Sequence, residues 1–280
     1  MNSNPPAALQ EIVEWRGVTD LVAAEVLNDD NGEGGYICDD VFAIAGVAEV
    51  SKATNASSEA HYYNNIPAVV VVGQSNDTIT ISASAIPLDV NAKLTGQDYD
   101  ETTGAFIEGE RKVRYFAVGY KTKKTNGDEV YVWRYKGVFN TIDQTNTTEN
   151  DGTDANGQEL VYTGISTTHK FSKTGKGAKA INVDLGKDLA NVTNFFSVVT
   201  TPDTLVPKVA RTLSISQATN TTLTVTRNGT ALANGDTVYD GDQLLITVTG
   251  GTVKVNNVAF TSGDIHVVTG NTTIASTASA

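Results

Sequence analysis

The chain has little of the chemistry on which most enzymes and disulfide-stabilised proteins depend. Its one cysteine, Cys38, cannot form an internal disulfide, and its neighbours, an isoleucine and two aspartates, would raise the pKa of the thiol. The three histidines are far apart in sequence, and none has a second histidine or a cysteine at metal-ligand spacing. We therefore expect no catalytic site, no metal and no cofactor, and structural or surface roles for His61, His169 and His266.

Nucleophile and phosphate-binding motifs are also missing. No Gly-x-Ser-x-Gly sequence occurs, and the glycine-rich, basic segment 173–179 lacks the spacing of a phosphate-binding loop. We interpret 173–179 as a flexible, solvated loop that could contact an acidic neighbour. Two tryptophans, Trp15 and Trp133, are too few and too scattered to indicate the aromatic platforms of a glycosidase.

Long hydrophobic runs are absent as well. The most apolar run, 69–73, is far shorter than the roughly 18 residues that span a bilayer. The first six residues do not have the charged and apolar regions of a secretory signal peptide. We therefore expect a soluble chain made in a reducing cytosol.

Basic residues are outnumbered by acidic ones. The 280 residues include 20 Lys and Arg against 32 Asp and Glu, a net charge of −12. Such a surface repels nucleic-acid phosphates and anionic membranes. Residues 205–280 contain four basic and four acidic side chains, so residues 1–204 carry the whole imbalance. This change in composition predicts two domains, the first formed by residues 1–204 and the second by residues 205–280.

What the sequence does contain is strand-forming segments between Gly, Asn and Asp turns, which predicts an all-β fold with one or two short helices. The clearest hairpin joins 114–121 to 129–139 through Asn126-Gly127, with aromatics or valines on both faces. Other expected strands of the first domain are 18–27, 41–50, 68–73 and 78–83, the last two flanking a turn at 73–77.

Helix signals are few. Segment 87–96 begins with Pro and ends with Gly, and Leu88, Val90 and Leu94 would form its apolar face. Segment 188–199 is a second candidate helix. After it, short strands at 212–216, 221–227, 243–249, 251–255 and 264–268 predict a small Ig-like β-sandwich.

Two acidic loops have residues of the kind that bind calcium. Asp29, Asn31, Glu33 and Asp40 imitate the spacing of an EF-hand loop, but flanking helices are absent and Asp replaces the bidentate Glu. We favour a hairpin turn there, and a long loop without a cation at 149–159.

The order of motifs in residues 13–204 resembles the major tail (tail tube) proteins of long-tailed phages that infect Gram-positive bacteria. The resemblance rests on segments 16–25, 46–51, 62–67 (Tyr-Tyr-Asn-Asn-Ile-Pro), 114–120 and 132–139, the last two matching an aromatic-Gly-aromatic strand followed by a Lys-Gly strand. Trailing Ig-like domains also occur in such proteins.

The resemblance implies a β-sandwich or half-barrel with a helix on one side, six copies in a ring, and rings stacked into a hollow tube for DNA. The implied partners are further copies, the tail terminator, the tape measure and distal tail proteins, and the location is the virion after assembly in the host cytoplasm. Segment 51–65 matches a long loop that reaches the next ring, and the arm 1–14 is a second stacking candidate. The expected contact residues are Ser51, Lys52, Glu59, His61, Tyr62, Tyr63, Asn64, Asn65 and Trp15.

Two other classes stay open from the residues alone. A bacterial surface adhesin or carbohydrate-binding module of Ig-like type would explain the strands, but no anchor motif or tandem module supports it. A carbohydrate-active enzyme is the third, weakened by the scattered tryptophans. The C-terminal domain could still bind a cell-wall carbohydrate weakly.

Overall fold

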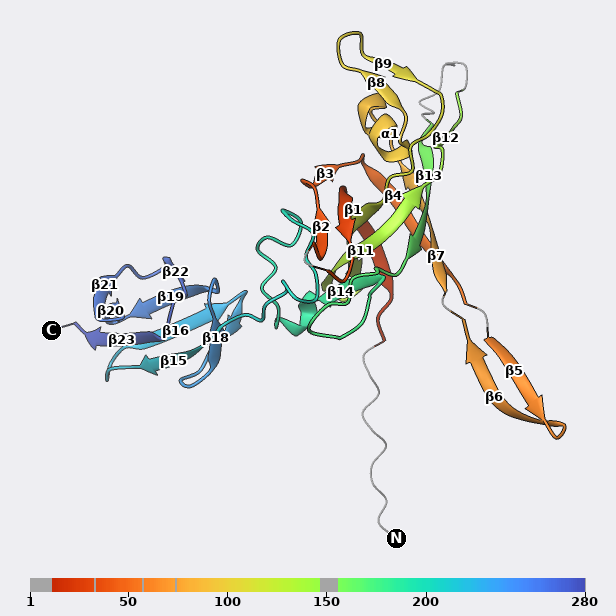
Figure 1. The fold of residues 1–280 in the computed structure, drawn as a ribbon. Helices are drawn as coiled ribbons and strands as arrows, with labels where there is room; N and C mark the ends of the chain where they lie inside the picture. The colour runs from red at the N-terminus through yellow and green to blue at the C-terminus, as the bar shows by residue number, and fades with distance from the viewer. Residues whose placement is uncertain (1–11, 33, 57, 74, 147–155, 280) are drawn as a thin grey trace. The chain divides into compact units, whose positions relative to one another are not determined.

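The computed structural model describes residues 12–32, 34–56, 58–73, 75–146 and 156–279. Within them the backbone is mostly strand (Figure 1), as expected from the sequence. The chain divides into two compact units, Met1–Val206 and Pro207–Ala280.

The first unit holds a ten-stranded sheet, two two-stranded sheets and a helix. Its strands are β1 (Trp15–Asp29), β2 (Tyr36–Cys38), β3 (Phe42–Ala43), β4 (Val47–Asn55), β5 (Ser58–Tyr63), β6 (Ile66–Val72), β7 (Asn76–Ala83), β8 (Asp98–Asp100), β9 (Ala105–Ile107), β10 (Phe116–Lys124), β11 (Glu129–Phe139), β12 (Asp143–Gln144), β13 (Gln158–Ile165) and β14 (Ala180–Asp184).

The large sheet runs in the order β2-β1-β10-β11-β13-β7-β4, with β3, β12 and β14 attached to β1, β13 and β11. Strands from near both ends of this order, β1 and β4, contribute to one core, yet they are not hydrogen-bonded to each other. The sheet is therefore a half-barrel that leaves the outer edge of β4 without a partner strand among the described residues.

The β10–β11 hairpin is confirmed and lies at the centre of this sheet. One face packs into the main core with Val118, Val132 and Phe139, and the other packs Trp133 and Tyr135 against residues 171–205. Trp133 donates from Nε1 to the carbonyl of Phe195 at 2.7 Å, so even its polar atom is satisfied. Burial on both faces explains why the hairpin carries apolar side chains on both.

The helix α1 (Leu88–Thr95) is also confirmed. Pro87 precedes it and Gly96 ends it with φ 69°, because only glycine adopts this left-handed conformation without strain. Its buried face was predicted only in part: Leu94 is buried, but Leu88 is 49% exposed. Among the described residues, no helix has the length and apolar character needed to cross a membrane.

Three sequence predictions are wrong. Segment 188–199 is not helical; a short 3₁₀ helix, η1 (Leu185–Lys187), precedes a series of turns. The side chain of Asn191 accepts from the amide and hydroxyl of Thr193, and such local bonding competes with a helix. Residues 44–46 interrupt the expected strand 41–50. The strand at 68–73 pairs with β5 rather than with β7, which lies between β4 and β13.

The second unit consists of two sheets around one core. Their orders are β18-β15-β23-β20-β21 and β17-β16-β19-β22. Inward-facing residues such as Leu213, Ile246 and Ile274 from both sheets form this core. The strands are β15 (Ala210–Ser216), β16 (Thr222–Arg227), β17 (Thr230–Ala231), β18 (Thr237–Tyr239), β19 (Gln243–Thr249), β20 (Gly251–Val255), β21 (Val258–Phe260), β22 (Ile265–Val267) and β23 (Thr272–Ala278).

Candidate assembly surface

The segment expected to be a long loop is instead a hairpin. Residues 51–55 continue β4, and β5 pairs with β6 in a two-stranded sheet of its own (Figure 1). Asn64 and Asn65 form the turn with φ 53° and 62°, the positive angles of a tight two-residue hairpin turn, which asparagine tolerates better than most residues. The Asn-Asn pair therefore fixes the register of the strands on either side.

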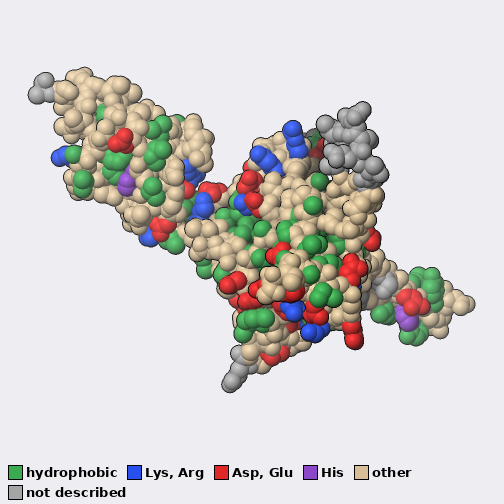
Figure 2. All heavy atoms as spheres, turned by 90° about the horizontal axis from the view of Figure 1, so that it is seen from above, with side chains coloured by type: hydrophobic (Ala, Val, Ile, Leu, Met, Phe, Trp, Pro, Cys, Tyr) green, Lys and Arg blue, Asp and Glu red, His purple; other side chains and the backbone are tan. Residues whose placement is uncertain are grey.

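The β5–β6 hairpin exposes apolar side chains on both faces. Neighbouring residues of a strand point to opposite faces, and Val69, Val70 and Val71 are respectively 50%, 62% and 50% exposed. Tyr62, Tyr63 and Ile66 near the turn are 64–66% exposed, and hydrophobic side chains of the hairpin are visible in Figure 2. A two-stranded hairpin is marginally stable alone, so this surface needs a covering partner.

The expected contact residues fall on three elements. Glu59, His61, Tyr62, Tyr63, Asn64 and Asn65 come together on the hairpin, whereas Ser51 and Lys52 are exposed on β4. Trp15 begins β1, is 67% exposed, and lines a cavity of about 700 Å³ together with Lys52. Of the arm 1–14, residues 1–11 lie outside the described residues.

Sequence reasoning missed the apolar half of this surface, which β6 supplies. Segment 68–73 was predicted only as a strand flanking a turn, and its valines were not among the expected contact residues. The polar segment 58–63 beside it was a signal for exposure, because a partner strand with few apolar side chains cannot form a core with it.

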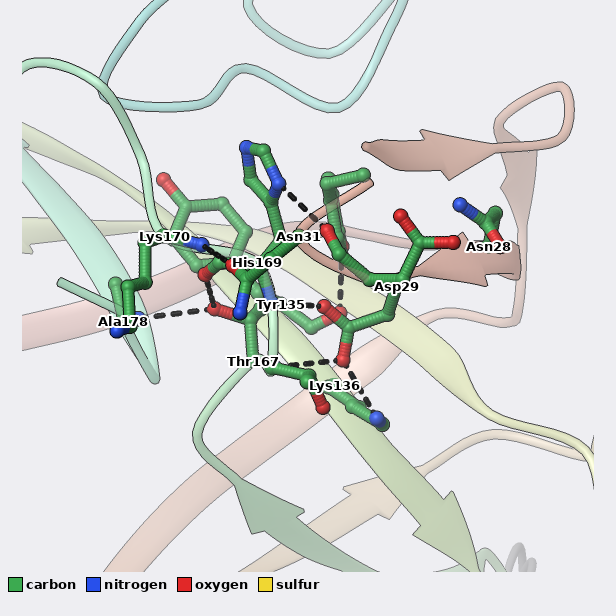
Figure 3. Close-up of polar contacts among 12 residues, drawn as sticks. Asn28, Asp29, Asn31, Tyr135, Lys136, Thr167, His169, Lys170 and Ala178 are labelled. Atoms are coloured by element: carbon green, nitrogen blue, oxygen red, sulfur yellow. Dashed lines mark hydrogen bonds and ion pairs between the residues drawn. The ribbon is translucent and has the colours of Figure 1, made fainter. Parts of the chain in front are cut away.

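The EF-hand-like loop forms a structural clasp. The carboxylate of Asp29 accepts from the amides of Thr168 and His169 at 2.8 Å each and from Lys136 Nζ at 2.5 Å. Asn31 Oδ1 accepts from the amide of Lys170 at 2.8 Å, so these oxygens face nitrogen donors (Figure 3). Burial opposes ionisation of Asp29, but the bonds from Lys136, Thr168 and His169 outweigh it and lower its pKa.

This geometry supports the hairpin-turn interpretation of the loop. Glu33 and most of 149–159 lie outside the described residues. In the described ranges, no three histidine, cysteine or carboxylate side chains are arranged to hold a metal ion. Burial raises the pKa of the Cys38 thiol to about 11, in the direction that the sequence predicted, which keeps it protonated and poorly nucleophilic at neutral pH.

Segment 173–179 is less free than expected. Asp203 accepts from the amides of Ser172 and Lys173 at 2.8 Å each, and Lys179 Nζ lies 2.6 Å from Ser75 Oγ and 3.4 Å from Asp77 Oδ1. Contact with acidic neighbours is therefore present, but it fixes the fold of the same chain.

Within the described residues, an apolar hairpin without a covering element and an unpaired sheet edge define a β-rich protein suited to assembly. A family model described as phage tail tube protein matches residues 32–201, and the chain belongs to this family. It is thus a structural component of a phage tail, and this membership favours a non-enzymatic role. A search of curated proteins found no match.

Proposed function

We propose that six copies of this chain close into a ring and that rings stack into the hollow tube of a long, non-contractile phage tail. The β5–β6 hairpin carries the proposal, because no described part of the first unit covers its apolar side chains. A head-to-tail contact that closes makes a ring, and one that repeats along an axis makes a filament. The unpaired β4 edge would pair with a neighbouring copy in the ring.

The tube would conduct DNA without binding it. Residues 1–204 carry the entire charge of −12, and acidic side chains along the bore would repel the phosphates of passing DNA. Charge reversals at bore-lining carboxylates that left genome ejection unchanged would count against this part. Tail terminator, tape measure and distal tail proteins would set the length and ends of the tube, after assembly in the cytoplasm of a Gram-positive host.

The second unit would be an Ig-like decoration that adheres weakly to cell-wall carbohydrate. Two facing sheets with one core, and a first strand β15 parallel to the last strand β23, support the Ig-like assignment. Many copies in register would turn weak binding into avidity. Equal adsorption to host cell walls by tubes of the full chain and by tubes of residues 1–206 would remove the support for adhesion.

The assembly proposal is tested by gel filtration and negative-stain electron microscopy across protein concentrations. We expect rings or hollow tubes from the wild type and only monomers from Ile66→Asp, because a carboxylate in the covered hairpin would be desolvated without a partner. Val258→Asp is the matched control: Val258 also lies on an exposed hairpin and is 70% exposed, compared with 65% for Ile66.

Two results would overturn the proposal. One is a wild type that stays monomeric after tail-initiation complexes are added, which would favour the adhesin class. The other is assembly by Ile66→Asp at the same protein concentration as the wild type and Val258→Asp.

A further inference from the structure

Three cations surround one buried carboxylate at the start of β7. Asp77 is 4% exposed, and its oxygens lie 3.4 Å from Arg134 Nη1, 3.4 Å from Lys179 Nζ and 3.9 Å from Lys52 Nζ. These four groups carry a net charge of +2. The first unit is otherwise rich in acidic groups, so this local excess of positive charge is unusual for the molecule.

Arg134 has too few acceptors in this cluster. It is 9% exposed, and its Nε is buried with no hydrogen-bond partner among the described residues. Asp77, at the long distance of 3.4 Å, is its one acceptor in the described chain. A buried guanidinium with five donors normally has a closer and more complete set of oxygens. Arg134 therefore has donors available for a second carboxylate.

The cluster borders a cavity that opens beside the unpaired β4 edge. Arg134 and Lys52 line this cavity of about 700 Å³ with residues of β1, β4, β10 and β11, including Glu49 and Trp15. Lys52 stands on β4 itself, and its side chain is 41% exposed. A group that approached along the β4 edge would meet Lys52 first and Arg134 behind it.

We infer that a carboxylate of a second copy of this chain fills the cavity and binds Lys52 and Arg134 when copies assemble. This inference rests on the assembly proposed above. A neighbouring copy brings an acidic surface, with 28 acidic against 16 basic residues in positions 1–204. Its carboxylate would neutralise part of the +2 charge and give Arg134 a second acceptor. Pairing would link closure of the β4 edge to a charge contact that salt weakens.

The inference is tested by zero-length carbodiimide cross-linking, which joins a lysine to a carboxylate only where the two are in contact. Tubes are formed from an equal mixture of unlabelled and nitrogen-15-labelled copies, because Lys52 also lies near Asp77 of its own chain. We expect a cross-link from Lys52 to an Asp or Glu of a differently labelled copy, present in tubes and absent from the monomer.

Variants at Lys52 supply a second readout. Lys52→Gln is expected to raise the protein concentration at half-assembly about tenfold and to weaken its dependence on sodium chloride, while Lys52→Arg keeps wild-type behaviour. Lys123→Gln is the control, because Lys123 is exposed on β10 away from the cluster. Lys52 is chosen over the buried Arg134 because an exposed site preserves folding.

The outcomes separate this inference from the assembly proposal. Normal tubes with only the internal Lys52–Asp77 cross-link, and equal behaviour of Lys52→Gln and Lys123→Gln, would overturn the inference alone. Inorganic phosphate that raised the Tm of the wild-type monomer but not of Lys52→Gln would assign the cavity to a free oxyanion instead. A wild type that never assembles would remove both proposals.

Discussion

Two hairpins of the first unit follow the same local rules and reach opposite environments. Both β10–β11 and β5–β6 have apolar side chains on both faces and turn through asparagine-containing loops. The chain covers the middle of β10–β11 on both faces: Trp133 and Tyr135 are 0% exposed. The described part of the chain leaves β5–β6 exposed, with Val70 62% exposed.

Apolar side chains on both faces of a strand therefore predict that the strand is buried, but they do not identify what covers it. For β10–β11 the cover is the half-barrel core on one side and residues 171–205 on the other. For β5–β6, no element of the described chain does the same, and we propose a second copy instead. Single substitutions test this difference, because buried and exposed positions of the two hairpins should lose different amounts of stability.

The largest effect is expected from Trp133→Ala. Removing a fully buried indole and its hydrogen bond to Phe195 should lower the free energy of unfolding by about 3–5 kcal/mol. Urea denaturation followed by far-UV circular dichroism measures the change. Trp15→Ala is the control, since Trp15 is 67% exposed; equal losses for both tryptophans would contradict the assigned core.

Asp29→Asn should follow, with a loss of about 2–4 kcal/mol at pH 7 because it breaks the clasp. The folded-state pKa of Asp29 is lowered, so its ionised form contributes stability above the unfolded pKa near 3.8, and this is lost as pH falls through the folded value. The stability difference between the wild type and Asp29→Asn should therefore shrink as the pH falls below about 3.8 in urea titrations, whereas Asp98→Asn, at an exposed strand position, should match the wild type at pH 7.

Gly137→Ala should cost about 1–3 kcal/mol, because a Cβ there would lie 2.3 Å from Tyr162 Cζ and 2.5 Å from the carbonyl oxygen of Thr163. The buried hairpin has no space for one methyl group. Thermal unfolding compares it with Gly109→Ala, where a Cβ meets nothing within 4 Å. An unchanged Tm for Gly137→Ala would show that Tyr162 moves aside freely.

The smallest effect on the monomer is expected from Val70→Thr, within about 0.5 kcal/mol of the wild type, because Val70 is exposed. Val118→Thr, the same change on β10 at 1% exposure, should cost about 2 kcal/mol. Urea denaturation of the monomers measures both. Equal effects would mean that β5–β6 is already covered within a single chain.

The sequence predicted the parts of the fold that local patterns determine. Asn126-Gly127 located the central hairpin, and Pro87 and Gly96 located α1, because these residues restrict the backbone by themselves. Strand pairing is not determined by local sequence. The strands that became β6 and β7 flank a turn in the sequence, but β7 pairs with β4 and β13. Likewise, the helix expected at 188–199 was overridden by turns and by packing of Phe195 on the central hairpin.

The candidate site was predicted in part for the same reason. The motif around Tyr62 and Asn65 led to expected contact residues on β5 and its turn, whereas the exposed valines of β6 were expected only as part of a strand. The cation cluster escaped sequence reasoning because Lys52, Asp77, Arg134 and Lys179 come from four separate segments. Only the folded sheet brings them together.

The clasp also delays folding of the protein during its synthesis. Asp29 bonds to an amide 140 positions later, and the partner of β7, β13, begins only at Gln158. At 5–20 residues per second, the ribosome needs roughly seven to thirty seconds between the two halves of the clasp. Until then β7, the neighbour of β4, lacks its own partner strand β13, so the free edge of β4 is not held in place. We expect protease resistance of β1, β4 and β7 only in nascent chains stalled after residue 170 has emerged, so a shorter nascent chain would be unable to join a growing tube.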